Sequence, residues 1–109
     1  MPVFSRGMSP VPKTYYDLRE VRSAIMSGQA FLAHRDKNME ALDDLGFSDE
    51  DAFAEIATLR PTQFTNTDWE RGRAADVYKK KIQGQLIYIK FFMENGLVVL
   101  SFHREGDCR

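Results

Sequence analysis

The alternation of apolar and polar residues is clearest in the last third of the chain, over residues 76–104. Aromatic and aliphatic residues alternate there with basic residues in three runs, and short turns separate the runs. Alternation with a period of two is typical of strands that bury one face. The second turn contains Asn95-Gly96, a pair that favours a tight hairpin because both residues tolerate positive φ. The pattern predicts a three-stranded antiparallel meander.

A two-residue loop at Asn95-Gly96 fixes the expected register of the last hairpin, because it places Glu94 opposite Leu97. On one face of that hairpin every pair is then apolar. These pairs are Ile89–Phe102, Phe91–Leu100 and Met93–Val98. The sequence therefore predicts a sheet face that can pack on a hydrophobic core.

The other face of the same hairpin carries polar groups of known chemistry. The register places Tyr88 opposite His103 and Lys90 opposite Ser101. Directly opposed side chains lie roughly 5 Å apart at Cβ. An imidazole titrates near neutrality and can transfer protons, and an ammonium can hold a phosphate. We therefore take Tyr88, His103 and Lys90 as candidate catalytic residues.

Three consecutive lysines, Lys79, Lys80 and Lys81, lie on the first strand of the meander. A two-residue loop at Gln83-Gly84 places Lys79 opposite Tyr88, and a slip of one residue places Lys80 there instead. Either register brings a second ammonium close to Tyr88. Lysines also protect edge strands from aggregation, which is the alternative interpretation of this run.

Helical periodicity precedes the meander. One helix is expected over about residues 18–27, capped by Asp17, and a second over about 36–45, ended by Gly46. A third begins at Ser48 and is expected to stop at Pro61. Residues 29–33 could form a short edge strand.

Two segments lack periodicity. Residues 1–13 contain Pro2, Pro10 and Pro12 and are expected to form a flexible arm before a single domain over 14–109. Residues 62–73 are expected to be irregular, with Phe64 and Trp69 as anchors. Helices followed by an antiparallel sheet indicate the α+β class, with the helices packed on the apolar face of the sheet. The face with Tyr88 would then stay partly open.

Composition narrows the function classes. The chain has 109 residues, enough for one modest core. Cys108 is the single cysteine, which excludes an internal disulfide and a cysteine-based zinc site. His34 has no partner by spacing, and because the two histidines come without a carboxylate motif, no metal site is expected. No cofactor is expected either. Without an apolar run of membrane-spanning length or a signal peptide, we expect a cytoplasmic protein that binds no membrane.

The charges are distributed unevenly along the chain. Residues 71–104 hold seven Lys or Arg against two acids, a net charge of +5, whereas residues 36–55 have a net charge of −7. Such a polarised molecule can bind an anion on one face although its total charge is only −1. Arg73, Arg104, Lys79 and Lys80 are the candidate residues for binding the phosphates of a nucleic acid. The alternative is that these charges only solvate the surface.

Three blocks in order, Asp76-Val77-Tyr78, Tyr88-Ile89-Lys90 and Val99-Leu100-Ser101-Phe102, resemble the motility quorum-sensing regulator (MqsR) toxins. The resemblance covers residues 14–104, and that family belongs to the wider RelE-like group of bacterial toxins. It implies a RelE-like fold.

The resemblance also implies an activity and partners. It indicates the toxin of a type II toxin–antitoxin system, an endoribonuclease (mRNA interferase) that cleaves single-stranded mRNA and is neutralised by a cognate antitoxin that binds DNA. The family's active-site tyrosine corresponds to Tyr88 and one of its lysines to His103. Its other lysine and its glutamine are replaced by Asn66 and Ala75.

We therefore expect a ribonuclease that needs no metal, because RNA supplies its own nucleophile in the 2′-hydroxyl. The alternative is a domain of the same fold that has lost catalysis and binds RNA or protein. The replacements at Asn66 and Ala75 favour the alternative, and the group formed by Tyr88, His103 and Lys90 favours catalysis.

Overall fold

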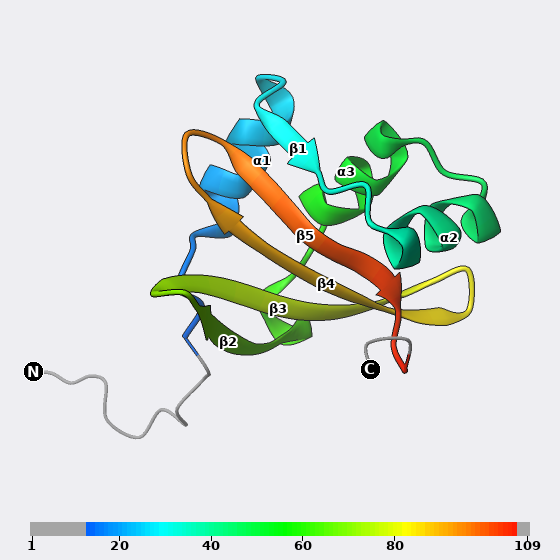
Figure 1. Ribbon diagram of the computed structural model, residues 1–109. Helices are drawn as coiled ribbons and strands as arrows, with labels where there is room; N and C mark the ends of the chain where they lie inside the picture. Colours follow the sequence, from blue (N-terminus) through cyan, green and yellow to red (C-terminus); the bar gives the residue numbers. More distant parts are fainter. Residues whose placement is uncertain (1–12, 107–109) are drawn as a thin grey trace, which may run out of the picture.

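The computed structural model describes residues 13–106, so the predicted arm lies almost wholly outside the described residues. Its centre is one sheet with the strand order β1–β5–β4–β3–β2 (Figure 1). The strands are β1 (Ala30–Leu32), β2 (Phe64–Glu70), β3 (Arg73–Ile82), β4 (Gln85–Met93) and β5 (Leu97–Arg104). β1 runs parallel to β5, and the other neighbours are antiparallel. The α+β class and the three-stranded meander are thus confirmed.

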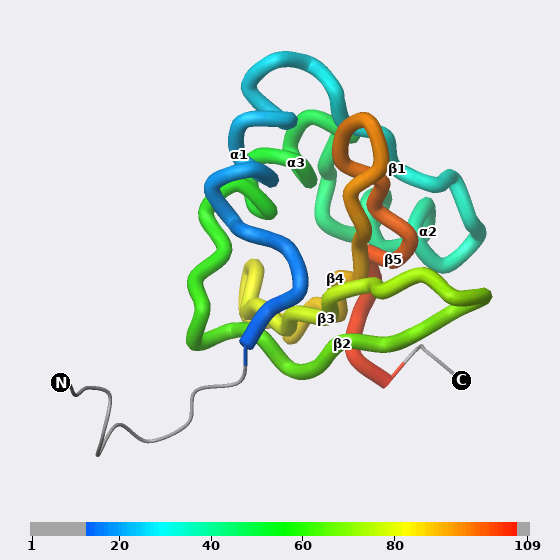
Figure 2. The backbone as a smooth tube through the Cα atoms, turned by 90° about the vertical axis from the view of Figure 1, so that its left-hand side faces the viewer, coloured from blue at the N-terminus to red at the C-terminus, as the bar shows by residue number. Residues whose placement is uncertain are grey.

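Three α-helices precede most of the sheet, as predicted. They are α1 (Leu18–Met26), α2 (Asp36–Leu45) and α3 (Asp49–Ala57). The helix α3 ends before Pro61, which instead opens a short 3-10 helix, η1 (Pro61–Gln63). Both views place the helices together beside β1 and β5, with β2 at the far edge (Figures 1 and 2).

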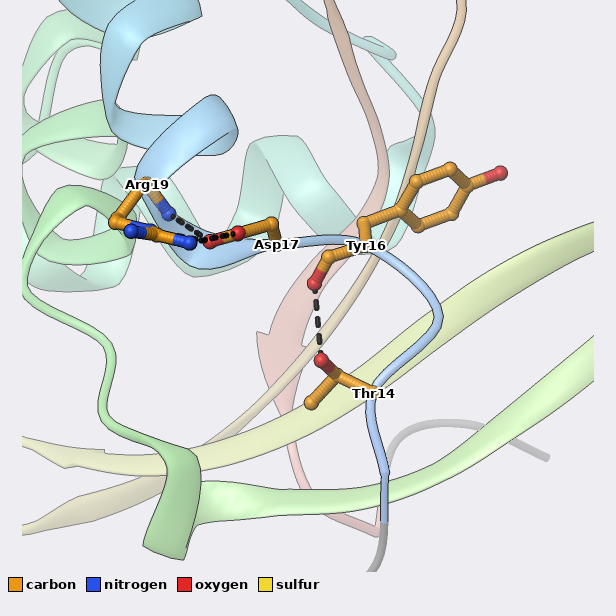
Figure 3. Close-up of polar contacts among 4 residues, drawn as sticks. All are labelled: Thr14, Tyr16, Asp17 and Arg19. Carbon is orange, nitrogen blue, oxygen red and sulfur yellow. Dashed lines mark hydrogen bonds and ion pairs between the residues drawn. The ribbon is translucent and has the colours of Figure 1, made fainter.

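Side-chain caps explain where the helices begin. The carboxylate of Asp17 accepts a hydrogen bond from the backbone N–H of Arg19 at 2.8 Å and pairs with its guanidinium at 2.9 Å (Figure 3). At the start of α3, Ser48 and Asp51 form a reciprocal capping box. Such caps satisfy backbone donors that the first helical turn leaves unpaired.

The hydrophobic core lies between the helices and one face of the sheet. We call this the helix face. Its buried members from the helices include Val21, Leu42 and Ile56, and from the sheet Ile89 and Phe102. Along each strand, residues that face this core alternate with residues that face the other side of the sheet, as the period of two predicts. The opposite face of the sheet, which carries Tyr88, is called the open face below.

The prediction for residues 62–73 is wrong, because most of this segment is strand β2, joined to β3 by a turn at Arg71-Gly72. Polar residues dominate the strand, so its sequence shows no alternation of apolar residues, and pairing with β3 specifies it instead. Phe64 packs edge-on against Tyr78, as an anchor would. Trp69 packs edge-on against the Tyr15 ring at 5.6 Å but is 62% exposed, so it does not anchor the segment in the core.

The predicted register of the last hairpin is correct from Tyr88 to Lys90 and wrong between Lys90 and the turn. Tyr88–His103, Ile89–Phe102 and Lys90–Ser101 pair as predicted. A bulge then shifts the register, so Phe91 lies opposite Val99 instead of Leu100, and Met93 lies opposite Leu97 instead of Val98. The connecting loop is therefore longer than the two residues expected.

Contacts outside the hairpin explain the bulge. The Asn38 side chain of α2 donates a hydrogen bond to the carbonyl of Leu100, the extra residue, at 3.0 Å. At the turn, a Cβ on Gly96 would lie 2.7 Å from the carbonyl oxygen of Gln29, just before β1. Contacts with the helix α2 and with the edge strand β1 therefore set the register of this hairpin, which the sequence of the hairpin alone does not specify.

Candidate active site

Three neighbouring strands place Lys79, Tyr88 and His103 in one row across the open face. Lys79 lies opposite Tyr88 on β3 and β4, and Tyr88 lies opposite His103 on β4 and β5. The Tyr88 and His103 rings stack with centroids 5.4 Å apart and an interplanar angle of 15°. The two-residue loop at Gln83-Gly84 is thereby confirmed, and the alternative with Lys80 opposite Tyr88 is excluded.

The hydrogen bond of His103 determines which ring nitrogen can accept a proton. Its Nδ1 lies 3.1 Å from the carbonyl oxygen of Arg104. A carbonyl oxygen only accepts, so the proton is assigned to Nδ1, and Nε2 carries the lone pair. His103 is 5% exposed, whereas Tyr88 is half-buried. Tyr88 is therefore the more accessible ring of the pair.

Lys90 lies in the middle of the open face and is neutralised there by two acids. Its ammonium pairs with Glu70, and with Asp68 at 3.4 Å, both from β2. Burial by itself lowers the pKa of Lys90, but the hydrogen bond and the charge of Glu70 outweigh burial and raise this pKa above its ordinary value. Lys90 is therefore charged, and a substrate phosphate would have to compete with the two carboxylates for it.

The two positions at which this chain departs from the resemblance also lie on the open face. Asn66 is opposite Val77, the residue that in turn faces Lys90, and its amide donates to the carboxylate of Asp68 at 2.8 Å. Ala75 is buried opposite Asp68. Position 66 thus carries a neutral side chain near the site, and position 75 carries no polar group.

Of the candidate RNA-binding residues, Arg73 and Lys79 lie on the open face. Arg73 pairs with Glu94 at 2.7 Å, and its guanidinium carbon lies 4.2 Å from the centroid of the Phe92 ring. The Lys79 ammonium lies 3.3 Å from the carboxylate of Glu105. Both cations have exposed surface left for a ligand, since their side chains are 50% and 33% exposed.

Lys80 and Arg104 do not join this group. Lys80 points to the helix face, where its ammonium contacts the backbone carbonyl and the carboxylate of Glu55, each at 2.9 Å. Arg104 lies opposite Ile87, a residue of the helix face, and its side chain is exposed at that side of the sheet. Side chains alternate across a strand, so neither cation reaches Tyr88 from its own strand.

The open face is more covered than we expected. Val77, Ala75 and Phe92 are buried there. Long side chains of the same face cover them: Arg73 lies over Phe92, and Lys90 reaches across to the acids of β2. Substrate would therefore meet the tips of these charged side chains and the edge of Tyr88.

Sequence reasoning missed the acids at Asp68 and Glu70. They alternate with Thr67 and Trp69, so both carboxylates project from the same face of β2. This alternation is visible in the sequence, but it places the two acids on one face only if residues 64–70 form a strand. Within residues 13–106 no group of three or more His, Cys, Asp or Glu residues could hold a metal ion. No helix in that range has the length and apolar character needed to span a bilayer.

Comparison with known proteins supports one family. Residues 13–104 match the sequence model of the family described as "Motility quorum-sensing regulator, toxin of MqsA". None of the curated proteins matches the chain.

Proposed function

The chain belongs to the motility quorum-sensing regulator toxin family and is the toxin of a toxin–antitoxin system, and we propose that it cuts single-stranded mRNA without a metal ion. An antitoxin partner follows from the family. That this antitoxin binds DNA, and that the pair acts in the cytoplasm, are part of the proposal.

The observation that carries the proposal is the row formed by Lys79, Tyr88 and His103. It combines an imidazole, a phenol and an ammonium on adjacent strands. Cleavage through the 2′-hydroxyl needs a base for that hydroxyl, positive charge for the phosphorane, and an acid for the leaving oxygen. The row offers one group for each task.

Nε2 of His103 takes the proton of the 2′-hydroxyl, and the 2′-oxygen forms a bond to phosphorus. The bond from phosphorus to the 5′-oxygen breaks, and the hydroxyl of Tyr88 protonates that oxygen. Lys79 stabilises the charge on the phosphorane, and Lys90 joins it if phosphate displaces Glu70. The products are a 2′,3′-cyclic phosphate and a 5′-hydroxyl, and both side chains then exchange protons with water.

The test is cleavage by the purified protein in the presence of a chelator. Single-stranded RNA should be cut, and the same sequence made as DNA should not, because DNA lacks the nucleophile. End-group analysis should find 2′,3′-cyclic phosphate and 5′-hydroxyl ends. Cleavage that requires a divalent cation, or that leaves 5′-phosphate ends, would contradict the mechanism.

The two histidines provide a matched pair of variants. His103→Asn removes the proposed base and should slow cleavage by roughly 10²–10⁴-fold. His34→Asn is the control, because His34 pairs with Asp49 at 2.8 Å at the start of α3, away from the row. Equal rates for both variants, at equal thermal stability, would remove His103 from the mechanism.

A second function is favoured by a specific observation. Asn66 and Ala75 stand where the family resemblance expects a lysine and a glutamine, and Lys90 is neutralised by Asp68 and Glu70. These features suit a domain that binds RNA without cutting it. That function predicts RNA binding with no cleavage at any protein concentration.

A further inference from the structure

A cavity of about 390 Å³ opens on the open face, near the β2–β3 turn. Three arginines from separate segments line it: Arg35 precedes α2, Arg71 lies in the turn, and Arg73 begins β3. Phe92 and Glu70 also contribute to its walls. We call this the arginine cleft. Its volume falls within the range of roughly 300–1,000 Å³ typical of ligand sites.

Arg73 is held in position before any ligand arrives. Its guanidinium lies over the Phe92 ring at 4.2 Å and pairs with Glu94 at 2.7 Å. A guanidinium fixed in this way loses little conformational entropy when it binds an anion. Arg73 therefore gives the cleft a rigid cationic wall.

Arg35 and Arg71 contrast with Arg73. Within residues 13–106 neither side chain forms an ion pair or a hydrogen bond, and both are exposed. Two guanidiniums without partners among the described residues line a cavity whose one lining acid, Glu70, is already bound to Lys90. The cleft thus has positive charge that the described part of the chain does not compensate.

The backbone at Arg71 adds an independent observation. Arg71 has a φ of 53°, a left-handed conformation that Gly, Asn or Asp adopts more easily. Gln83 occupies the equivalent position of the next turn with a φ of 52°, but its side chain donates a hydrogen bond to the carbonyl of Leu45. Arg71 has no such bond, so local structure does not explain an arginine at this position.

We infer that the arginine cleft binds a backbone phosphate of single-stranded RNA beside the phosphate that is cut. The identity of the ligand as RNA rests on the proposed function. Planar guanidiniums match phosphate oxygens in pairs, and three of them favour a phosphodiester over a neutral ligand. Phe92 and Arg73 supply the aromatic and planar surfaces on which RNA bases commonly stack.

The position of the cleft fits a strand that also reaches Tyr88. Phe92 and Tyr88 lie on the same face of β4, four residues and therefore about 13 Å apart. Lys90 lies between them on that face. An extended RNA strand lying along β4 would therefore meet the arginine cleft, Lys90 and the row at Tyr88 in turn.

The test measures binding of a probe that cannot be cut, a fluorescent single-stranded RNA methylated at every 2′-oxygen. The double variant Arg35→Gln/Arg71→Asn removes two cations, and Asn suits the left-handed turn, so folding should be retained. The control is Arg22→Gln/Arg60→Gln, which removes equal charge from α1 and from the segment between α3 and η1. Fluorescence anisotropy over a series of salt concentrations gives the affinity and its salt dependence.

The cleft variant should bind the probe about tenfold more weakly than wild type. Its plot of log affinity against log salt should be shallower by about 0.7, since one phosphate contact contributes about 0.7 for single strands. The control should change the affinity by less than about twofold, because screening weakens distant charges. Equal losses in both double variants, or no loss in either, would overturn the inference.

Two further arms separate this inference from its alternatives. If poly-glutamate binds in a way that depends on Arg35 and Arg71 while the RNA probe does not, the cleft recognises an acidic protein, and the RNA assignment is overturned. If the probe needs the cleft but RNA is never cut, the cleft stands and the proposed ribonuclease fails. If RNA is cut and binding of the probe does not depend on these arginines, the proposed ribonuclease stands and the inference fails.

Discussion

Tyr78 and Tyr88 lie on neighbouring strands of one sheet but on opposite faces. Tyr78 is fully buried between the rings of Phe64 and Phe91, with both centroid distances at 5.5 Å. Its hydroxyl has no hydrogen-bond partner among the described residues. Burial, with the charge of Asp76, raises the pKa of Tyr78 to about 12. Tyr88 instead is half-buried, stacks on His103 and faces Lys79.

The difference shows how the two faces use polar residues. The buried groups Asp76, on the helix face, and Asn38 of α2, against β5, bond to backbone from distant segments, so they hold the fold together. On the open face, cations and acids gather around Tyr88 and Lys90 with partial pairing. The first arrangement predicts losses of stability on mutation, and the second predicts losses of binding or activity.

The largest effect on stability is expected at Asp76. Its carboxylate is fully buried and accepts hydrogen bonds from the backbone N–H of Tyr15 at 3.1 Å, that of Tyr16 at 2.8 Å and the Thr67 hydroxyl at 2.6 Å. Asp76→Asn would turn an amide donor toward these donors and should lower the free energy of unfolding by about 3 kcal/mol. Urea denaturation measures this loss.

Asp68→Asn on the open face is the matched control for Asp76→Asn. The Asp68 side chain is 40% exposed and contacts Lys90 at 3.4 Å. Asp68 itself is partly exposed and Glu70 still pairs with Lys90 in this variant, so the change should cost less than about 1 kcal/mol. An equal loss in the free energy of unfolding for Asp76→Asn and Asp68→Asn would contradict the contrast between the two faces.

A smaller effect is expected from the acids around Lys90, and it should depend on pH. The pKa of Lys90 is raised in the folded protein, so its stabilising contribution is complete below the unfolded value of about 10.4 and is lost as pH rises through the folded value. Wild type should exceed Asp68→Asn/Glu70→Gln in stability by under about 1 kcal/mol at pH 8, because Glu70 is half exposed.

Urea denaturation between pH 8 and pH 12 tests this dependence. The difference between wild type and the double variant should shrink as pH rises above about 10.4. The titration of Tyr78 affects both proteins alike and cancels in the comparison. A difference that stays constant over this range would show that the Lys90 charge does not stabilise the fold.

Much of the fold follows from local patterns in the sequence. The helix caps at Asp17 and Ser48, the alternation in β4 and the turn at Gln83-Gly84 were each sufficient to predict their elements. The pair Tyr88–His103 was predicted because the register errors cancelled near it: the bulge lies beyond Lys90, on the side toward the turn. Local pattern therefore specifies the strands and the Lys79–Tyr88 pair, whereas the Tyr88–His103 pair also depends on the bulge.

The rest depends on contacts between distant segments. The strand β2 is an edge strand of polar residues, so only pairing with β3 specifies it, and its acids at Asp68 and Glu70 could not be placed. The bulge needs Asn38 of α2, and the arginine cleft combines Arg35 with residues more than thirty positions away. No local window of sequence contains these combinations.

The most direct test of the account compares Tyr88→Phe with Tyr78→Phe, two variants that each remove one hydroxyl from opposite faces. Cleavage of single-stranded RNA in a chelator is measured alongside thermal unfolding. Tyr88→Phe should slow cleavage at least about 10²-fold with an almost unchanged unfolding temperature. Tyr78→Phe should cut at the wild-type rate and be as stable as wild type or more so, because it removes a buried hydroxyl without a partner. Wild-type cleavage by Tyr88→Phe would contradict the central claim that the open face carries the chemistry.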